Sequence, residues 1–407
     1  MNAAQPYAAR PRAKKQRFPF SLYCLTLGAF AIGMTEFVIM GLLPNVAADL
    51  NVTIPQAGQL ITSYALGVAF GAPVLTVATH RVPPKLLLLL LMGIFIAGNV
   101  LSVIAPNYPF LIVTRIVTAL AHGTFLGAGT IMASKLVAPE RRAAAVSMVL
   151  AGLSISNIVG VPFGTFIGQQ FGWRASFAAI ALLGVVALLG IARFIPVIGS
   201  GESSNLSDQV RGLFNRKVMV TLLTGAFCCA SLFSLFTYIT PILIDISGFQ
   251  EASVTWILVL FGIGITLGNL LGGKLADWRP MGSTVMVLAA LAVILALLPF
   301  AFPNSALAVA SVFIWGVAAF AVLPGVQVRI MTLAKAPLLA SSSSHSVMNA
   351  GNAGGAYLGG VVITYAGLSY VPYLASALAL CSLGGAVAGF LLERKRQPAA
   401  AAEAVAR

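Results

Sequence analysis

The sequence predicts an all-α membrane protein with twelve transmembrane helices in two six-helix bundles. The first observation is composition: 59% of the 407 residues are hydrophobic and 8% are charged, whereas a soluble domain carries about 25% charged residues. The second is that the apolar residues form long runs, and a membrane-spanning helix needs about 20 such residues. The third is that Lys and Arg recur between alternate pairs of runs, the pattern of the positive-inside rule.

Twelve apolar runs are long enough to span a bilayer. They cover residues 20–43, 55–78, 86–105, 108–133, 143–167, 173–194, 217–243, 252–275, 282–302, 305–333, 341–366 and 370–392. Because the number is even, both termini are expected on one side of the membrane.

The charged residues between the runs indicate which side that is. One set of segments is basic and holds the N-terminal tail, Arg81, Lys85, Lys135, Arg141, Arg142, the stretch from Arg193 to Lys217, Lys274, Arg279, Arg329, Lys335 and the C-terminal tail. The other set holds Arg174 beside Asp49, Asp245 and Glu251. This asymmetry predicts cytoplasmic termini in a cell inner membrane. It also attributes the net charge of +14 to topology rather than to nucleic-acid binding.

The polar break between the sixth and seventh runs divides the chain into two halves. We expect a cytoplasmic tail over residues 1–19, a bundle over 20–195, a linker over 196–216, a second bundle over 217–393 and a tail over 394–407. The halves repeat weakly, because Gly67 and Gly71 recur as Gly264 and Gly268, and Gly160 and Gly164 as Gly355 and Gly359, at nearly the same offset. Repeated halves around a midplane site are typical of transporters.

Glu36 lies within the first apolar run, about 10 Å below the outer surface at 1.5 Å per residue. Arg115, in the fourth run, is expected at the same depth. A direct or water-mediated pair is the simplest way to keep both charges there. Intramembrane charges often mark ion or substrate paths, so Glu36 is a candidate proton-binding group. The alternative is a fixed ion pair that only holds two helices together.

His122 follows Arg115 by two helical turns and shares its helix face. It could relay a proton or line a substrate cavity, or it could be a neutral histidine bonded to a neighbouring helix. Further candidates for the cavity are polar or bulky residues in facing spans: Met40, Asn157, Phe236, Tyr238, Asn349 and Asn352. For these, packing between helices or contact with lipid is the alternative.

The fifth run carries glycines at multiples of four, a pattern that allows close helix packing: Gly152, Gly160, Gly164 and Gly168. Pro162 removes a backbone donor and predicts a bend.

Several motifs resemble the major facilitator superfamily. They are TEFVIMGLLP from Thr35 to Pro44, the segments from Arg115 to Gly123 and from Asn157 to Arg174, and NAGNAGGAYLGG from Asn349 to Gly360. Within that family, the sequence resembles the twelve-span drug:proton antiporters of the bacterial sugar-efflux and purine-efflux branch. The family's cytoplasmic loop motif is present once as GGKLADWR, with Asp277, and once altered as LTVATHRVPPK, where His80 replaces the acid and Arg81 remains. The resemblance implies gating roles for Asp277 and Arg81, together with Gly160 and Pro162.

The resemblance implies a proton-coupled exporter of small organic molecules such as drugs, sugars or nucleosides. Glu36, Arg115 and His122 are then the proton-coupling residues. A proton-independent facilitator of a small polar solute is the main alternative, and a non-transporting sensor on the same fold is another. The sequence contains no nucleophile–base set and no metal or cofactor motif, so neither an enzyme nor a cofactor is expected. The expected partners are the substrate, protons and membrane lipid, and the expected state is a monomer.

Overall fold

A computed structural model describes residues 18–79, 81–197, 215–333 and 337–394. Most of both expected tails, most of the expected linker, and His80 lie outside this part. Every regular element in the described residues is helical, which confirms the predicted all-α class.

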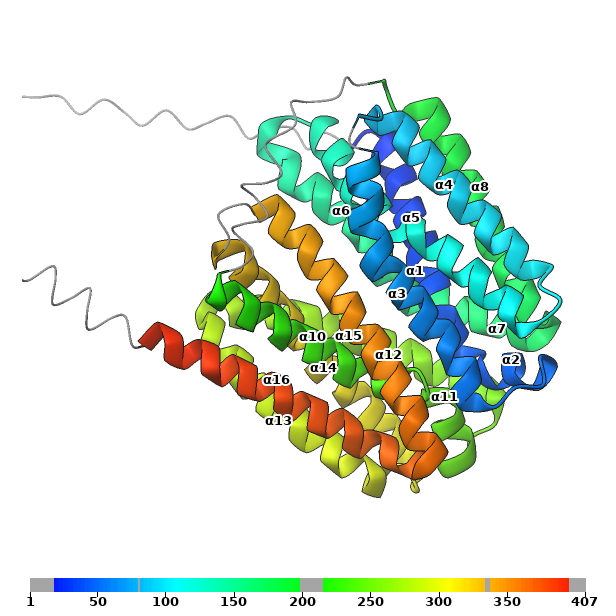
Figure 1. The fold of residues 1–407 in the computed structure, drawn as a ribbon, viewed down its shortest axis with the longest axis vertical. Helices are drawn as coiled ribbons and strands as arrows, with labels where there is room; N and C mark the ends of the chain where they lie inside the picture. The colour runs from blue at the N-terminus through cyan, green and yellow to red at the C-terminus, as the bar shows by residue number, and fades with distance from the viewer. Residues whose placement is uncertain (1–17, 80, 198–214, 334–336, 395–407) are drawn as a thin grey trace, which may run out of the picture.

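The N-terminal group consists of α1 (Phe20–Gly41), α2 (Leu43–Asp49), α3 (Ile54–Ala78), α4 (Pro84–Val103), α5 (Tyr108–Lys135), η1 (Pro139–Arg141), α6 (Arg142–Ile155), η2 (Ser156–Gly160), α7 (Val161–Phe171) and α8 (Trp173–Phe194). The C-terminal group consists of α10 (Arg216–Phe236), α11 (Ile239–Pro241), η3 (Ile242–Ile246), α12 (Glu251–Trp278), α13 (Pro280–Ala301), α14 (Ser305–Leu333), α15 (Pro337–Tyr365), η4 (Leu368–Tyr370) and α16 (Val371–Arg394). Figure 1 shows the two groups side by side, with α3 and α15 adjacent along the boundary.

Eleven segments of the described chain are long and apolar enough to cross a membrane. The remaining expected span, 341–366, coincides with α15, which is 29 residues long but is not among the eleven. Its repeated Ser, Asn and Gly residues lower its hydropathy. Such a composition suits a helix that faces other helices, and α15 packs mainly against α10 and α3.

Local sequence signals explain where several helices begin. Thr53 and Gln56 form a capping box at the start of α3, and Asn107 accepts a hydrogen bond from the Phe110 amide at the start of α5. Proline at the first position of α4 fits because the amide there has no helical partner. Gly172 adopts φ 86° between α7 and α8, a conformation that favours glycine.

The expected fifth span is interrupted at its centre. The π-helical turn η2, Ser156–Gly160, separates α6 from α7 directly before Pro162. Proline cannot donate to the carbonyl one turn earlier, and a π-turn is one way to accommodate such a break. The structure therefore places an irregular turn where Pro162 predicts a bend. The glycine stripe is also confirmed, because Gly152, Gly160, Gly164 and Gly168 all lie against side chains or backbone of α1 and the loop after it.

The two groups are joined at the end where α1 and α10 end and α12 begins, which we call the junction end. There Asn45 donates to Glu251 Oε2 (3.2 Å), Gln169 donates to the Glu251 carbonyl (3.0 Å), and Thr255 donates to Gln169 Oε1 (3.1 Å). Thr240 also donates to the Met40 carbonyl at 2.8 Å.

Asp49, at the end of α2, connects the junction end to α8 through hydrogen bonds. Its Oδ2 accepts from Arg174 Nη1 at 2.6 Å and from Trp173 Nε1 at 3.0 Å. The hydrogen bond from Arg174, and then that from Trp173, lowers the pKa of Asp49 below its ordinary value. The carboxylate therefore contributes stability above about pH 4, and that contribution is lost as the pH falls through the lowered folded pKa.

We expect Asp49→Asn to lose this acid-sensitive contribution. The melting temperature of the wild type, followed from neutral pH to below about pH 4, should fall more steeply than that of the variant. A difference between the two proteins that is the same at every pH would contradict this assignment.

Candidate functional site

Glu36 is a buried carboxyl group in the second half of α1. The residue is 8% exposed, and its Oε2 lies 3.9 Å from Nε2 of His122 on α5. Helix α1 is in contact with α5, α6 and α8 of the N-terminal group. On its other side, Phe37 packs against Phe233 and Phe236 of the C-terminal group. The carboxyl group thus lies at the boundary between the groups.

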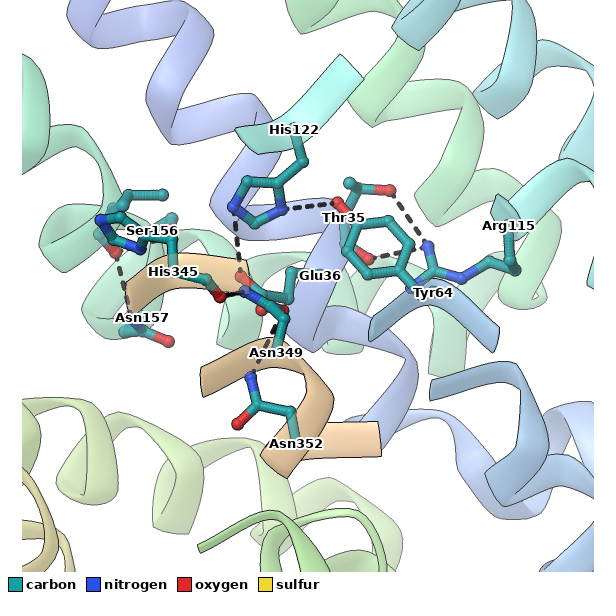
Figure 2. Close-up of polar contacts among 11 residues, drawn as sticks. Thr35, Glu36, Tyr64, Arg115, His122, Ser156, Asn157, His345, Asn349 and Asn352 are labelled. Atoms are coloured by element: carbon teal, nitrogen blue, oxygen red, sulfur yellow. Dashed lines mark hydrogen bonds and ion pairs between the residues drawn. The ribbon is translucent and has the colours of Figure 1, made fainter. Parts of the chain in front are cut away.

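Tyr64, on α3, connects the remaining members of the site (Figure 2). Its hydroxyl lies 3.1 Å from His122 Nδ1. Its ring lies under the guanidinium of Arg115, with 4.2 Å from Cζ to the ring centroid. The tyrosine was not among the residues predicted from the sequence, yet it contacts two of them.

Arg115 is fully buried, and its guanidinium group is hydrogen-bonded to α1. Nη1 donates to the Thr35 carbonyl at 2.9 Å and contacts Thr35 Oγ1 at 3.4 Å. Thr35 Oγ1 in turn donates to Asn99 Oδ1 at 2.8 Å, which fixes the threonine side chain. Within the described residues, Nε and Nη2 of Arg115 have no hydrogen-bond partner.

Of the two forms of pairing predicted for Glu36 and Arg115, direct or through water, the direct contact is not present among the described residues. Arg115 bonds to Thr35, whereas the ion-pair partner of Glu36 is His122. Both side chains are buried, so the Arg115 guanidinium and the Glu36 carboxyl group still interact electrostatically. The fixed positive charge of Arg115 favours the ionised form of the carboxyl group, whereas burial favours the protonated form, so a change in the surroundings of Glu36 can change its protonation state.

Amide side chains from η2 and α15 approach this site, as Figure 2 shows. Asn157 donates to the Leu153 carbonyl (3.1 Å) and Asn349 donates to the His345 carbonyl (3.0 Å). Asn352 Nδ2 lies 3.5 Å from Asn349 Oδ1, and its own Oδ1 is buried with no hydrogen-bond partner among the described residues. These amides offer polar groups to a ligand from both halves of the molecule.

The other predicted cavity residues are packed inside the protein. Met40 and Tyr238 are 0% exposed and Phe236 is 2% exposed. The Tyr238 hydroxyl donates to the Ala356 carbonyl at 2.9 Å, and Phe236 lies in an aromatic cluster with Phe261 and Trp315. In this conformation they do not line an accessible surface, because the groups close over them at the junction end.

The predicted gating residues divide into two pairs. Gly160 and Pro162 are buried at the break between η2 and α7, and Gly160 lies against the ring of Phe30. Arg81 and Asp277 are exposed at the end opposite the junction end, and no ion pair joins them in the described part of the chain. Their gating role remains a prediction.

Residues 25–345 match the family model described as Major Facilitator Superfamily. The chain is 41% identical over 381 residues to the inner membrane transport protein YdhP of Escherichia coli (strain K12), covering 93% of this chain and 97% of that protein. It is 29% identical over 365 residues to a chloramphenicol resistance protein of Streptomyces lividans, covering 88% and 93%.

Solved structures agree with the fold. The chain resembles a crystal structure of a D-xylose–proton symporter with a TM-score of 0.73 and 16% identity, covering 90% of this chain and 97% of that one. At this identity the likeness concerns the fold alone.

Proposed function

Because the chain belongs to the Major Facilitator Superfamily, we propose that it exports small organic molecules across the bacterial inner membrane in exchange for protons. Proteins of this family are carriers rather than enzymes. The name of the chloramphenicol resistance protein supports export and a drug-like substrate class. Sugars and nucleosides are the other substrate classes to be tested.

The observation that carries the proton coupling is the contact between Glu36 and His122 beside Arg115. A lone carboxylate in a membrane interior is costly and is rare without a function. Here it lies at the boundary between the two groups, 3.9 Å from a titratable imidazole. A rearrangement of the groups would change the access of water to Glu36 and so its affinity for protons.

We assign the structure to one state of an alternating-access cycle. With twelve spans and both termini in the cytoplasm, the junction end faces the outside, and the hydrogen bonds of Asn45, Gln169, Thr255 and Glu251 hold it closed. Substrate then reaches the amides of α15 and η2 from the cytoplasmic side. The outward-open state requires these bonds to break.

Gln169→Ala should favour the state that is open at the junction end. The substitution removes one hydrogen bond to Glu251 and one from Thr255, and two such bonds correspond to a shift of roughly tenfold in the population ratio. Spin labels at Ala48 and Ala252, both exposed, would report the change as a longer distance. Gln170→Ala is the matched control, and an equal distance distribution in both variants would contradict the role of Gln169.

The transport test uses purified protein in liposomes with a trapped pH dye and an imposed proton gradient. The panel contains sugars, purine nucleosides and neutral or cationic drugs, chloramphenicol among them. Proton release that requires one ligand class supports antiport and identifies that class. Ligand flux without proton movement would instead establish a proton-independent facilitator.

A further inference from the structure

We propose that Tyr64 is a positioning residue of the proton site, because its hydroxyl holds His122 in the tautomer that directs Nε2–H toward Glu36. The importance of this role for transport rests on the proposed function. The hydrogen-bond geometry itself does not, and it can be tested separately.

The two ring nitrogens of His122 have different partners. Nδ1 faces the Tyr64 hydroxyl at 3.1 Å, and Nε2 faces Glu36 Oε2 at 3.9 Å (Figure 2). A neutral imidazole has one donor nitrogen and one acceptor nitrogen, and the bond to one nitrogen determines the role of the other. A phenol hydroxyl that donates to Nδ1 therefore leaves the proton on Nε2.

The opposite tautomer is less favourable when Glu36 is ionised. It would direct the lone pair of Nε2 toward a carboxylate oxygen, which is an acceptor only. Among the described residues, His122 Nδ1 is the one hydrogen-bond partner of the Tyr64 hydroxyl, so donation to Nδ1 satisfies both groups. Tyr64 is 2% exposed, so bulk solvent has little access to this bond.

The charged and titratable groups around His122 come from several helices. They are Glu36 of α1, Tyr64 of α3, Arg115 of α5 and His345 of α15. Of these, Tyr64 contacts both the imidazole and the guanidinium. Its helix α3 also packs against α15 of the C-terminal group, so a movement at this boundary can change the hydrogen bond to His122.

The decisive variant is Tyr64→Phe, which removes the hydroxyl and keeps the ring against Arg115. The matched control is Tyr108→Phe. Tyr108 also links α3 and α5 through its hydroxyl, but it donates to the Gln56 carbonyl at 2.7 Å, away from the proton site. Both variants lose one tyrosine hydroxyl between the same two helices.

The tautomer can be read by nitrogen NMR of histidine-labelled protein in lipid nanodiscs at alkaline pH, since protonated and non-protonated imidazole nitrogens resonate far apart. The chain has three histidines, and the spectrum of His122→Gln identifies the signal of His122. We expect Nε2 to be protonated in the wild type and in Tyr108→Phe, and this preference to be lost in Tyr64→Phe. Protonation on Nδ1 in the wild type, or an unchanged spectrum in Tyr64→Phe, would overturn the proposal.

A transport readout then separates this proposal from the proposed function. Proton-coupled flux in Tyr64→Phe should fall about tenfold, as expected for one lost hydrogen bond, and its pH profile should shift, while Tyr108→Phe retains the wild-type profile. The pH profiles of Tyr64→Phe and Tyr108→Phe could be equal while coupling is abolished in Glu36→Gln. That result would reject the positioning role of Tyr64 and would leave the proposal of proton antiport intact. Coupling that persists in Glu36→Gln would reject the proposed function, whereas the histidine spectra would still decide the tautomer.

Discussion

Replacing Glu36 by glutamine should abolish substrate-driven proton release while the fold and ligand binding persist. The amide has nearly the same shape as the carboxyl group but cannot bind and release a proton at neutral pH. Groups that transfer protons in this way typically contribute about a hundredfold or more to the rate. We therefore expect proton release in liposomes to fall to the background of protein-free vesicles.

The fold should tolerate this change because the amide is nearly isosteric with the carboxyl group and Arg115 keeps its hydrogen bond to the Thr35 carbonyl. The melting temperature of Glu36→Gln should stay within a few degrees of that of the wild type. Asp245→Asn is the matched control, since Asp245 is an exposed carboxylate in η3 at the junction end, and we expect it to retain full coupling. Wild-type proton release in Glu36→Gln would identify Glu36 as a structural residue and would remove the basis for antiport.

The sequence was sufficient to predict the all-α class of fold and the family. Apolar runs of about 20 residues determine helices in a membrane with little ambiguity. The rise per residue then places Glu36 and Arg115 at one depth, and the two-turn separation places His122 on the face of Arg115. The structure brings these three residues into one region, with the imidazole next to the carboxyl group.

The partner of each charge could not be predicted in the same way. Depth along a helix follows from residue spacing, but the rotation of one helix relative to another depends on packing. As a result Arg115 faces the Thr35 carbonyl, one residue before Glu36, and the imidazole contacts Glu36 instead. Tyr64 was missed for the same reason, since a tyrosine in an apolar run carries no signal of its contacts on another helix.

Burial of the candidate cavity residues depends on the conformational state, which a sequence does not specify. Met40 and Phe236 belong to helices that meet at the junction end, and both are buried because that end is closed. The structure confirms that the expected segment 341–366 lies in a helix of 29 residues, α15. The low hydropathy of this helix fits its packing against α3 and α10.

The largest effect on stability is expected at Gly355 of α15, where the backbone of α10 approaches most closely. A Cβ atom at this position would overlap the carbonyl oxygen of Ala230 and would also meet its C and Cα atoms at 2.7 Å. These are backbone atoms, so no side-chain rotation can relieve the contact, and the two helices must separate. Overpacking of this kind costs roughly 1–3 kcal/mol.

Gly354→Ala is the control that isolates this contact from the helix propensity of alanine. It is the neighbouring residue on the same helix, and a Cβ atom there would meet nothing within 4 Å. Alanine in place of glycine favours a helix by up to about 1 kcal/mol, so Gly354→Ala should keep or raise the melting temperature in detergent, while Gly355→Ala lowers it by several degrees. Equal melting temperatures would mean that α10 and α15 are not in close contact. Because the same two helices carry the amides of α15 and the aromatic residues of α10, that result would also require a different arrangement of the proposed substrate site.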